Sequence, residues 1–398
     1  MSNTDSDSAS NGTTIVNQSG GVSVEAETVN VGGDLIARDK IVNNVANIYQ
    51  RALTAAEEAR QAHSIETEYL ARGVSVYAER LRTNATKTDD RGGPYKGLLE
   101  YRLSDAEIFF GRERAIGEAL QHLDRNPLTV LHSESGTGKT SLLQAGVSAR
   151  LIVNGHLPIY CRPYDVSPAQ SIKQALLPNL SQTPGLSGAS LRDFLWQVCN
   201  VLGANTTLYI LLDQFEEFFL HLDDAQRATF VRELAECLND ASLNVRWLLA
   251  LRSEFFGQLA NFRPRISNPF ENDYRLNRLT RDEAEAVIAK PADRYGVSFE
   301  AGLIDTLLDD LGQTDFTPPQ IQLVCSALYG ELGDAKTITR ELYEREGGAA
   351  GILRGHLERV LNRVPATQRP AARQLLEALI SSEPRRIIRT RTDLVAEL

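Results

Sequence analysis

The sequence has no uninterrupted apolar run of roughly 18 residues, the length from which a membrane-spanning helix is recognised. It also lacks a basic start followed by an apolar stretch, because its first residues, MSNTDSDSASNGTT, are polar and acidic. We therefore expect neither a membrane span nor a secretory signal.

Paired cysteines are missing as well. Cys161, Cys199, Cys237 and Cys325 are far apart and form no C-x-x-C motif. This spacing favours buried thiols in a reducing cytosol over zinc ligands or disulfides, so we expect a cytoplasmic protein. The first 90 residues contain no nucleophile–base pair or metal-binding cluster. The formal net charge of −10 argues against a protein whose whole surface binds nucleic acid.

The composition changes several times along the first 93 residues. Residues 1–14, rich in Ser, Asn, Asp and Thr, predict a disordered tail. Residues 15–44 alternate valine with polar residues between Gly-Gly pairs, which predicts very short strands, either a solenoid-like coil or a pair of hairpins. Residues 45–82 predict one or two helices, and residues 83–93 predict a linker. An N-terminal piece this small is expected to pair with copies of itself.

After residue 94, helical patterns alternate with short apolar runs, which is typical of an α/β fold with a parallel sheet. Three runs read as buried strands: PLTVLH (127–132), TLYILLD (207–213) and VRWLLALR (245–252). The carboxyl ends of such strands are where α/β proteins place ligands.

The pattern after residue 276 is helical, and TRDE at 280–283 predicts a capping box at a helix start. The chain ends in RRIIRTRTDLVAEL, which predicts the start of a strand or hairpin and a recognition-type helix. We expect a core over 94–275, a helical segment over 276–345 and a final, truncated domain over 346–398.

A phosphate-binding loop is predicted by SESGTGKT, which follows the first of these strands. Ser133 stands where the pattern G-x-x-x-x-G-K-[ST] begins with glycine, and we expect it to be tolerated. Gly136 and Gly138 let the backbone curl around a phosphate, Lys139 supplies charge, and the Thr140 hydroxyl suits Mg²⁺. The expected nucleotide-binding residues are Ser135, Gly136, Thr137, Gly138, Lys139, Thr140 and Ser141.

An acid at the end of a second strand completes the expected magnesium site. Asp213 follows LYILL, and Thr140 and Asp213 are the residues expected to hold Mg²⁺, Asp213 through water. Glu216 or Glu217, three and four residues later, could orient or deprotonate an attacking water. Arg252 closes the third strand, where an arginine can sense a terminal phosphate.

Several motifs occur in the order found in one family. PYKGLLEYRLSDAEIFFGRER, SGTGKTSLLQAGV, LLDQFEEFF, LALRSEFF and LTRDEAEAVIAKPA resemble the signal-transduction ATPases with numerous domains (STAND), and within them the novel STAND NTPase type-one group. The resemblance covers residues 94–398. It implies a P-loop NTPase core of α/β, AAA+-like fold, a helical lid and a winged-helix domain.

The resemblance also implies roles for residues outside the loop. Phe110, Gly111 and Arg112 would contact adenine through their backbone. Pro318 and Pro319, in FTPPQIQLV, would stand for the G-x-P motif of the lid and pack near base and ribose, with the choice between them open.

The family resemblance implies a switch that binds ATP and hydrolyses it slowly. Bound ADP would keep it closed, and exchange of ADP for ATP would let it oligomerise and activate an effector. Bacterial antiphage defence is the biology it implies. The trigger is unknown; we expect a sensor in a C-terminal domain beyond residue 398 and an effector or adaptor partner at the N-terminal segment.

Two other functions fit the same residues. A DNA-binding ATPase or transcription regulator would use the arginines near the C-terminus: Arg385, Arg386, Arg389 and Arg391. We favour a solvated or nucleotide-facing edge for them. A scaffold that binds nucleotide without hydrolysing it is the other alternative, and replacing Glu216 and Glu217 together would separate it from an ATPase.

Overall fold

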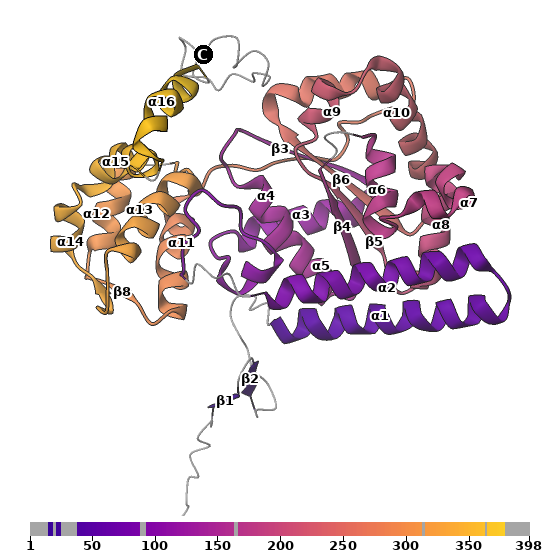
Figure 1. The fold of residues 1–398 in the computed structure, drawn as a ribbon, viewed down its shortest axis with the longest axis horizontal. Coiled ribbons are helices and arrows are strands. Elements are labelled where there is room, and N and C mark those ends of the chain that lie inside the picture. Colours follow the sequence, from indigo (N-terminus) through magenta and orange to yellow (C-terminus); the bar gives the residue numbers. More distant parts are fainter. Residues whose placement is uncertain are drawn as a thin grey trace, which may run out of the picture. The chain divides into compact units, whose positions relative to one another are not determined.

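The structure is a computed structural model that describes residues 15–18, 21–24, 38–87, 93–162, 166–312, 315–362 and 364–378. The chain forms two compact units (Figure 1). The first unit comprises Met1–Gly92 and Leu99–Leu279, and the second comprises Gly93–Leu98 and Thr280–Leu398.

The first unit is built on a five-stranded parallel sheet in the order β4-β5-β6-β3-β7. The strands are β3 (Leu128–Ser133), β4 (Leu157–Cys161), β5 (Leu208–Leu212), β6 (Val245–Arg252) and β7 (Asp273–Arg275). This confirms the α/β class predicted from sequence. The apolar runs predicted as strands are β3, β5 and β6, whereas β4 and β7 were not predicted.

Both faces of this sheet are buried, which explains why β5 and β6 are apolar almost throughout. Successive side chains of a strand point to opposite faces. In β6, Trp247, Leu249 and Leu251 belong to one apolar cluster, while Leu248 and Ala250 belong to the other. Polar and charged residues lie at the carboxyl ends of these strands, beyond the apolar layers.

Helices cover both faces of the sheet. Those of the first unit, after the N-terminal pair, are η1 (Leu103–Ile108), α3 (Glu113–Arg125), α4 (Lys139–Ser141), η2 (Leu142–Ser148), α5 (Ala149–Val153), α6 (Pro168–Leu176), η3 (Leu180–Gln182), α7 (Pro184–Gly188), α8 (Leu191–Leu202), α9 (Glu216–His221), α10 (Asp224–Leu238) and η4 (Ser253–Phe262). α4, η2 and α5 form one continuous helix after the loop, and η2 is its π-helical middle.

Two long N-terminal helices, α1 (Arg38–Gln61) and α2 (Ile65–Thr86), lie side by side in Figure 1 and pack on the core. The side chain of Asn44 donates to the carbonyls of Ile152 (3.1 Å) and Val153 (2.7 Å), which end α5. The Tyr77 hydroxyl donates to the Pro158 carbonyl of edge strand β4 (2.9 Å). The helical pair is thus part of the same folded unit as the sheet.

The second unit is mostly helical, in line with the predicted lid. Its elements are α11 (Arg281–Arg294), β8 (Ser298–Phe299), α12 (Leu303–Leu311), α13 (Pro318–Gly330), β9 (Thr337–Ile338), α14 (Arg340–Arg345), α15 (Gly348–Asn362), η5 (Ala366–Gln368) and α16 (Arg369–Ala378). The capping box predicted at Thr280 is confirmed, because Thr280 and Glu283 exchange backbone-to-side-chain hydrogen bonds.

The segment Gly93–Leu98 belongs to this second unit although it precedes the sheet in sequence. The Tyr95 hydroxyl donates to the Ile288 carbonyl (2.6 Å), and the Lys96 backbone N–H donates to the Gln322 side chain (2.8 Å). The compact units therefore divide the chain differently from the ranges 94–275 and 276–345.

Some sequence predictions fall partly or wholly outside the described residues. In the segment 15–44, predicted as short strands, β1 (Ile15–Gln18) and β2 (Gly21–Val24) form an antiparallel pair, but the prediction is wrong for residues 38–44, which form the start of α1. The strand predicted near Val31, the tail 1–14, and the winged-helix end with its arginines lie outside the described residues. Among the helices that the structure does describe, none has the length and apolar character needed to cross a membrane.

Candidate functional site

The predicted phosphate-binding loop joins the end of β3 to the start of α4. Gly136 (φ +81°) and Gly138 (φ +94°) both adopt the left-handed region that glycine tolerates best. Their conformation turns the chain sharply out of the strand, and the helix begins at Lys139. The sequence pattern and the local geometry therefore agree at this loop.

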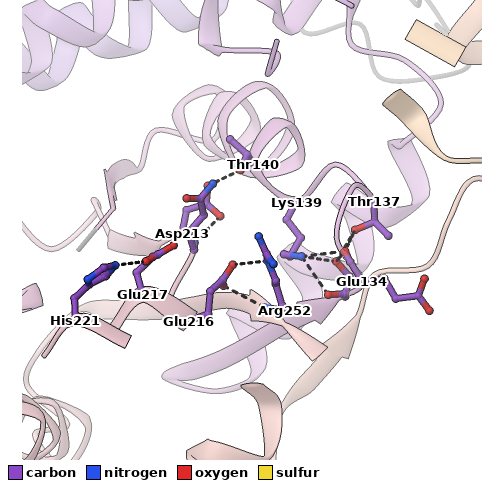
Figure 2. Close-up of polar contacts among 11 residues, drawn as sticks. Glu134, Thr137, Lys139, Thr140, Asp213, Glu216, Glu217, His221 and Arg252 are labelled. Carbon is purple, nitrogen blue, oxygen red and sulfur yellow. Dashed lines mark hydrogen bonds and ion pairs between the residues drawn. The ribbon is translucent and has the colours of Figure 1, made fainter. Parts of the chain in front are cut away.

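Lys139 is buried and folds back over the loop (Figure 2). Its ammonium group donates to the carbonyls of Ser133 and Glu134 (both 3.2 Å) and to the Ser133 hydroxyl (2.8 Å). The Ser133 hydroxyl also hydrogen-bonds the hydroxyl of Thr137. The serine at the first position of the motif is thus an internal part of the loop.

Asp213 lies immediately after β5, beside this loop. Its side chain is fully buried, and one carboxylate oxygen accepts from the Thr140 hydroxyl (2.7 Å). The other oxygen accepts from the backbone N–H of Gln214 (2.9 Å), which has a positive φ of +52°. This backbone conformation is uncommon outside glycine and often marks functional sites. The two expected magnesium ligands are therefore in direct contact.

Glu216 and Glu217 face different partners, as Figure 2 shows. Glu216 is buried, and its carboxylate pairs with the guanidinium of Arg252 (3.1 Å) and accepts from the Arg252 backbone N–H (3.2 Å). Glu217 instead pairs with His221 on the next helical turn (2.6 Å). Consecutive residues on a helix point about 100° apart, which separates the two carboxylates.

Aromatic packing sets the orientation of α9. Phe215 and Phe218 stack with ring centroids 4.7 Å apart, and both pack against Phe230 and Phe262. Since Phe218 and Phe219 are buried, the face of α9 that carries them is held on the core. This anchoring leaves Glu216 directed to the end of β6.

Burial shifts the ionisation of two groups at the site. It raises the pKa of Glu216 above its usual range, although Lys139 and Arg252 both lower it. It lowers the pKa of the Lys139 ammonium, although Glu216 and Asp213 both raise it. In each case desolvation is the larger cause, as expected for charged groups held away from water.

The residues predicted to contact adenine lie between η1 and α3. The buried Arg112 donates to the Thr137 carbonyl of the loop (2.8 Å), and Gly111 has a positive φ of +76°. Phe110 precedes them and is partly buried. Arg112 therefore connects this stretch to the phosphate-binding loop by its side chain.

Two further residues from the sequence analysis belong to the second unit. Pro318 and Pro319 are the first residues of α13, where proline is favoured because the first helical N–H groups have no intrahelical acceptor. The Thr317 side chain before them hydrogen-bonds Gln320 (2.6 Å).

Sequence reasoning missed Tyr160 and Arg162, which come from the end of β4. The Tyr160 hydroxyl donates to Asp213 (2.7 Å), and the Arg162 guanidinium donates to the Tyr160 hydroxyl (2.8 Å). The run LPIYCR has the pattern of an apolar strand followed by a charged residue. Recognising it as a strand would have placed both residues at the carboxyl edge of the sheet.

The oxygen atoms of Thr140 and Asp213 suit a small hard cation, since Mg²⁺ prefers oxygen ligands and keeps several waters. Within the described residues, no group of three or more His, Cys, Asp or Glu side chains could hold a metal ion. Thr140 and Asp213 are therefore the oxygen donors that the structure brings together at the position expected for magnesium.

Comparison with known proteins gives one family match. The family model described as Novel STAND NTPase 1 matches residues 94–397. No curated protein matches the sequence.

Solved structures similar to this chain include a Walker-type ATPase of Pyrococcus abyssi, at 15% identity over 75% of this chain and 90% of that chain, with a TM-score of 0.46. The ORC2 protein of Aeropyrum pernix in its ADP form is similar at 17% identity over 65% and 70% of the two chains, with a TM-score of 0.45. The ORC1 protein of Aeropyrum pernix in complex with DNA follows at 14% identity over 71% and 72%, with a TM-score of 0.41.

Proposed function

The chain belongs to the Novel STAND NTPase 1 family, and we propose that it is a signalling switch that binds ATP and hydrolyses it slowly. The observation that carries the proposal is the junction of β3 and α4. There Lys139 and Thr140 follow two glycines with positive φ, and Thr140 contacts the buried Asp213.

Nucleotide binding is assigned to the loop and the helix start that follows it. Backbone N–H groups of residues 135–141 would hold the phosphates, and Lys139 would add charge to the outer ones. Phe110, Gly111 and Arg112 would hold adenine, with Arg112 tied to the loop at Thr137. The assignment of Pro318 and Pro319 to base and ribose is a proposal on family resemblance.

Mg²⁺ is the cation that we propose for this site, with Thr140 and Asp213 as the residues that hold it. When bound, the ion neutralises charge on the phosphates that are being separated. The protein supplies the rest: the buried Asp213 is held in place by the donors around it, and Thr140 is held at the N-terminus of a helix.

Glu216 is the residue that we propose for orienting or deprotonating the attacking water. It is buried beside the loop lysine, and its carboxylate is held by Arg252. A carboxylate whose pKa is raised is a better base near neutral pH than an exposed one. The pairing of Glu217 with His221 makes it the weaker candidate.

Arg252 is the proposed link between the nucleotide and the rest of the switch. It lies beside the start of the loop, because Ser133 and Arg252 are register partners in neighbouring strands. A terminal phosphate would compete with Glu216 for its guanidinium, so ATP and ADP would bind different states with different affinity. Oligomerisation in the ATP state, in cytoplasmic antiphage defence, completes the proposal.

The first test is to purify the protein without added nucleotide, denature it, and identify any released nucleotide by chromatography. We expect about one ADP per chain, which is what a closed switch retains. An empty site with steady ATP turnover would instead indicate an ordinary ATPase and would contradict the switch.

A second measurement separates hydrolysis from binding alone. The double variant Glu216→Gln, Glu217→Gln should keep nucleotide binding and lose turnover. If turnover were unchanged, the slow hydrolysis would not come from this site, and the protein would be better described as a nucleotide-binding scaffold.

A further inference from the structure

Tyr160 and Thr140 donate to the same oxygen of Asp213. Both hydroxyl groups lie 2.7 Å from Oδ2, while Oδ1 accepts from the Gln214 backbone. The three donors come from three separate elements: the end of β4, the start of α4 and the turn after β5. Asp213 is thus held from several directions in a fully buried position.

Arg162 supports the tyrosine from its other side. Its Nε donates to the Tyr160 hydroxyl (2.8 Å) and lies 3.7 Å from Oδ2 of Asp213. One of its terminal nitrogens lies 4.0 Å from the Glu100 carboxylate. Because the Tyr160 oxygen accepts from Arg162, its single proton is directed to Asp213.

Packing fixes the Tyr160 side chain in place. The tyrosine ring packs against the apolar cluster on the α3 side of the sheet, which limits its movement. The Tyr160 hydroxyl is therefore held 2.7 Å from Oδ2 as a donor to the carboxylate.

An aspartate that holds magnesium must keep one orientation, and a fixed hydrogen-bond donor helps to maintain it. A cation next to Thr140 and Asp213 would attract the carboxylate, and the hydrogen bonds to Asp213 resist its movement. Tyr160 would then keep the buried carboxylate satisfied and in the same rotamer. Groups that orient metal ligands in this way typically change metal affinity by about 10–100-fold when they are replaced.

We propose that Tyr160, held by Arg162, is a positioning residue for Asp213 and sets the Mg²⁺ affinity of the nucleotide site. This inference rests on the proposed function, because it assumes that Asp213 serves a nucleotide-bound cation. It adds β4, one of the two strands that were not predicted from the sequence, to the elements that contribute to that site.

The test compares Tyr160→Phe with the wild-type chain. Full-length protein, stripped of nucleotide and metal with EDTA, is titrated with a fluorescent ADP analogue at a series of MgCl₂ concentrations. We expect the variant to bind the analogue in EDTA as the wild type does, and to need about tenfold more Mg²⁺ for the Mg²⁺-dependent gain in affinity. Unchanged binding in EDTA also shows that the variant is folded.

Tyr209→Phe is the matched control. Tyr209 is a buried tyrosine of the neighbouring strand β5, packs in the same apolar cluster, and bonds the Asp124 carboxylate (3.2 Å). Its replacement should leave the Mg²⁺ requirement unchanged. A similar loss in both variants would mean that removing any buried tyrosine hydroxyl disturbs the sheet, and would overturn the specific role of Tyr160.

Arg162→Gln tests the chain of contacts. If Arg162 acts through Tyr160, the substitution Arg162→Gln should raise the Mg²⁺ requirement of the wild-type chain and add little to that of Tyr160→Phe. An effect of equal size in both backgrounds would show that Arg162 acts independently of Tyr160.

The inference and the proposed function fail in different ways. A wild-type protein that binds no nucleotide would overturn both. A wild-type protein that binds nucleotide with Mg²⁺, alongside a Tyr160→Phe variant with the same Mg²⁺ requirement, would overturn only the role of Tyr160.

Discussion

The carboxylate of Glu216 accepts the backbone N–H of Arg252 at 3.2 Å and pairs with the guanidinium of the same residue at 3.1 Å. A single arginine thus holds this acid through both its main chain and its side chain. The contact joins α9 to the end of β6, the strand next to the one that leads into the phosphate-binding loop.

This contact predicts different roles for the two glutamates. We expect Glu216→Gln to lower kcat for ATP by about a hundredfold or more, within the range for loss of a general base. Glu217→Gln should lower it by less than about tenfold, because that carboxylate is directed to His221. Steady-state phosphate release measures both, and the opposite ranking would assign the water-orienting role to Glu217.

The raised pKa of Glu216 predicts a pH dependence of turnover. The base works when ionised, so kcat is full above the folded-state pKa of Glu216 and falls as the pH falls through it. Since burial raises this pKa, the acid limb should lie at higher pH than for an exposed glutamate. A pH profile of kcat checks this, with Glu217→Gln as control. An acid limb in the range of an ordinary glutamate would contradict the assignment.

Arg252 should distinguish the two nucleotides. Arg252→Ala is expected to weaken ATP binding by about tenfold, because a charge-assisted hydrogen bond contributes about 1.5–3 kcal/mol and part of it is recovered by water. ADP affinity should change much less. Titration with ADP and a non-hydrolysable ATP analogue measures both values. Equal losses of affinity for the two nucleotides would contradict a role of Arg252 in sensing the terminal phosphate.

Ser133→Gly should change nucleotide affinity by less than about tenfold, or roughly 1.4 kcal/mol. The hydroxyl does bond Lys139 and Thr137, but each partner keeps another acceptor in the loop, the carbonyl of Glu134. Calorimetric titration with ADP gives the answer. A larger change would show that the serine is needed to hold Lys139 in place.

The positions of the loop, Asp213 and Arg252 at the carboxyl edge of the sheet could be predicted because their signals are local. The loop and Asp213 follow buried strands and Arg252 ends one, so neighbouring residues define them. The choice between Glu216 and Glu217 could not be made, since it depends on how Phe218 packs in the core. Sequence shows that two acids are adjacent, but not which one faces the loop.

Other features depend on contacts between distant segments. Tyr160 reaches Asp213 across 53 residues of sequence, and Asn44 reaches Ile152 across 108. No motif connects such pairs. Apolar residues at helical spacing in 41–52 predict a helix with one buried face, but they do not say which surface it covers.

Asn44 gives a prediction about stability. Asn44→Ala should lower the free energy of unfolding by about 1–2 kcal/mol, since two carbonyls at the end of α5 would lose their donor. Asn47→Ala, an exposed asparagine one turn away on α1, is the matched control and should be nearly neutral. Chemical denaturation followed by circular dichroism compares them. Equal changes in the free energy of unfolding for the two variants would mean that water replaces Asn44 as the donor to these carbonyls.

Because of the α1–α2 pair, the start of the family match and the start of the folded unit lie at different places in the sequence. The family match begins at residue 94, but buried side chains such as Ile41, Val45 and Leu70 belong to the same apolar cluster as strands β4 to β6. A fragment cut at the family boundary would expose that cluster and the outer edge of β4, a template for aggregation. We therefore expect a stable fragment of this P-loop NTPase core to need α1 and α2 in addition to the residues that the family model matches.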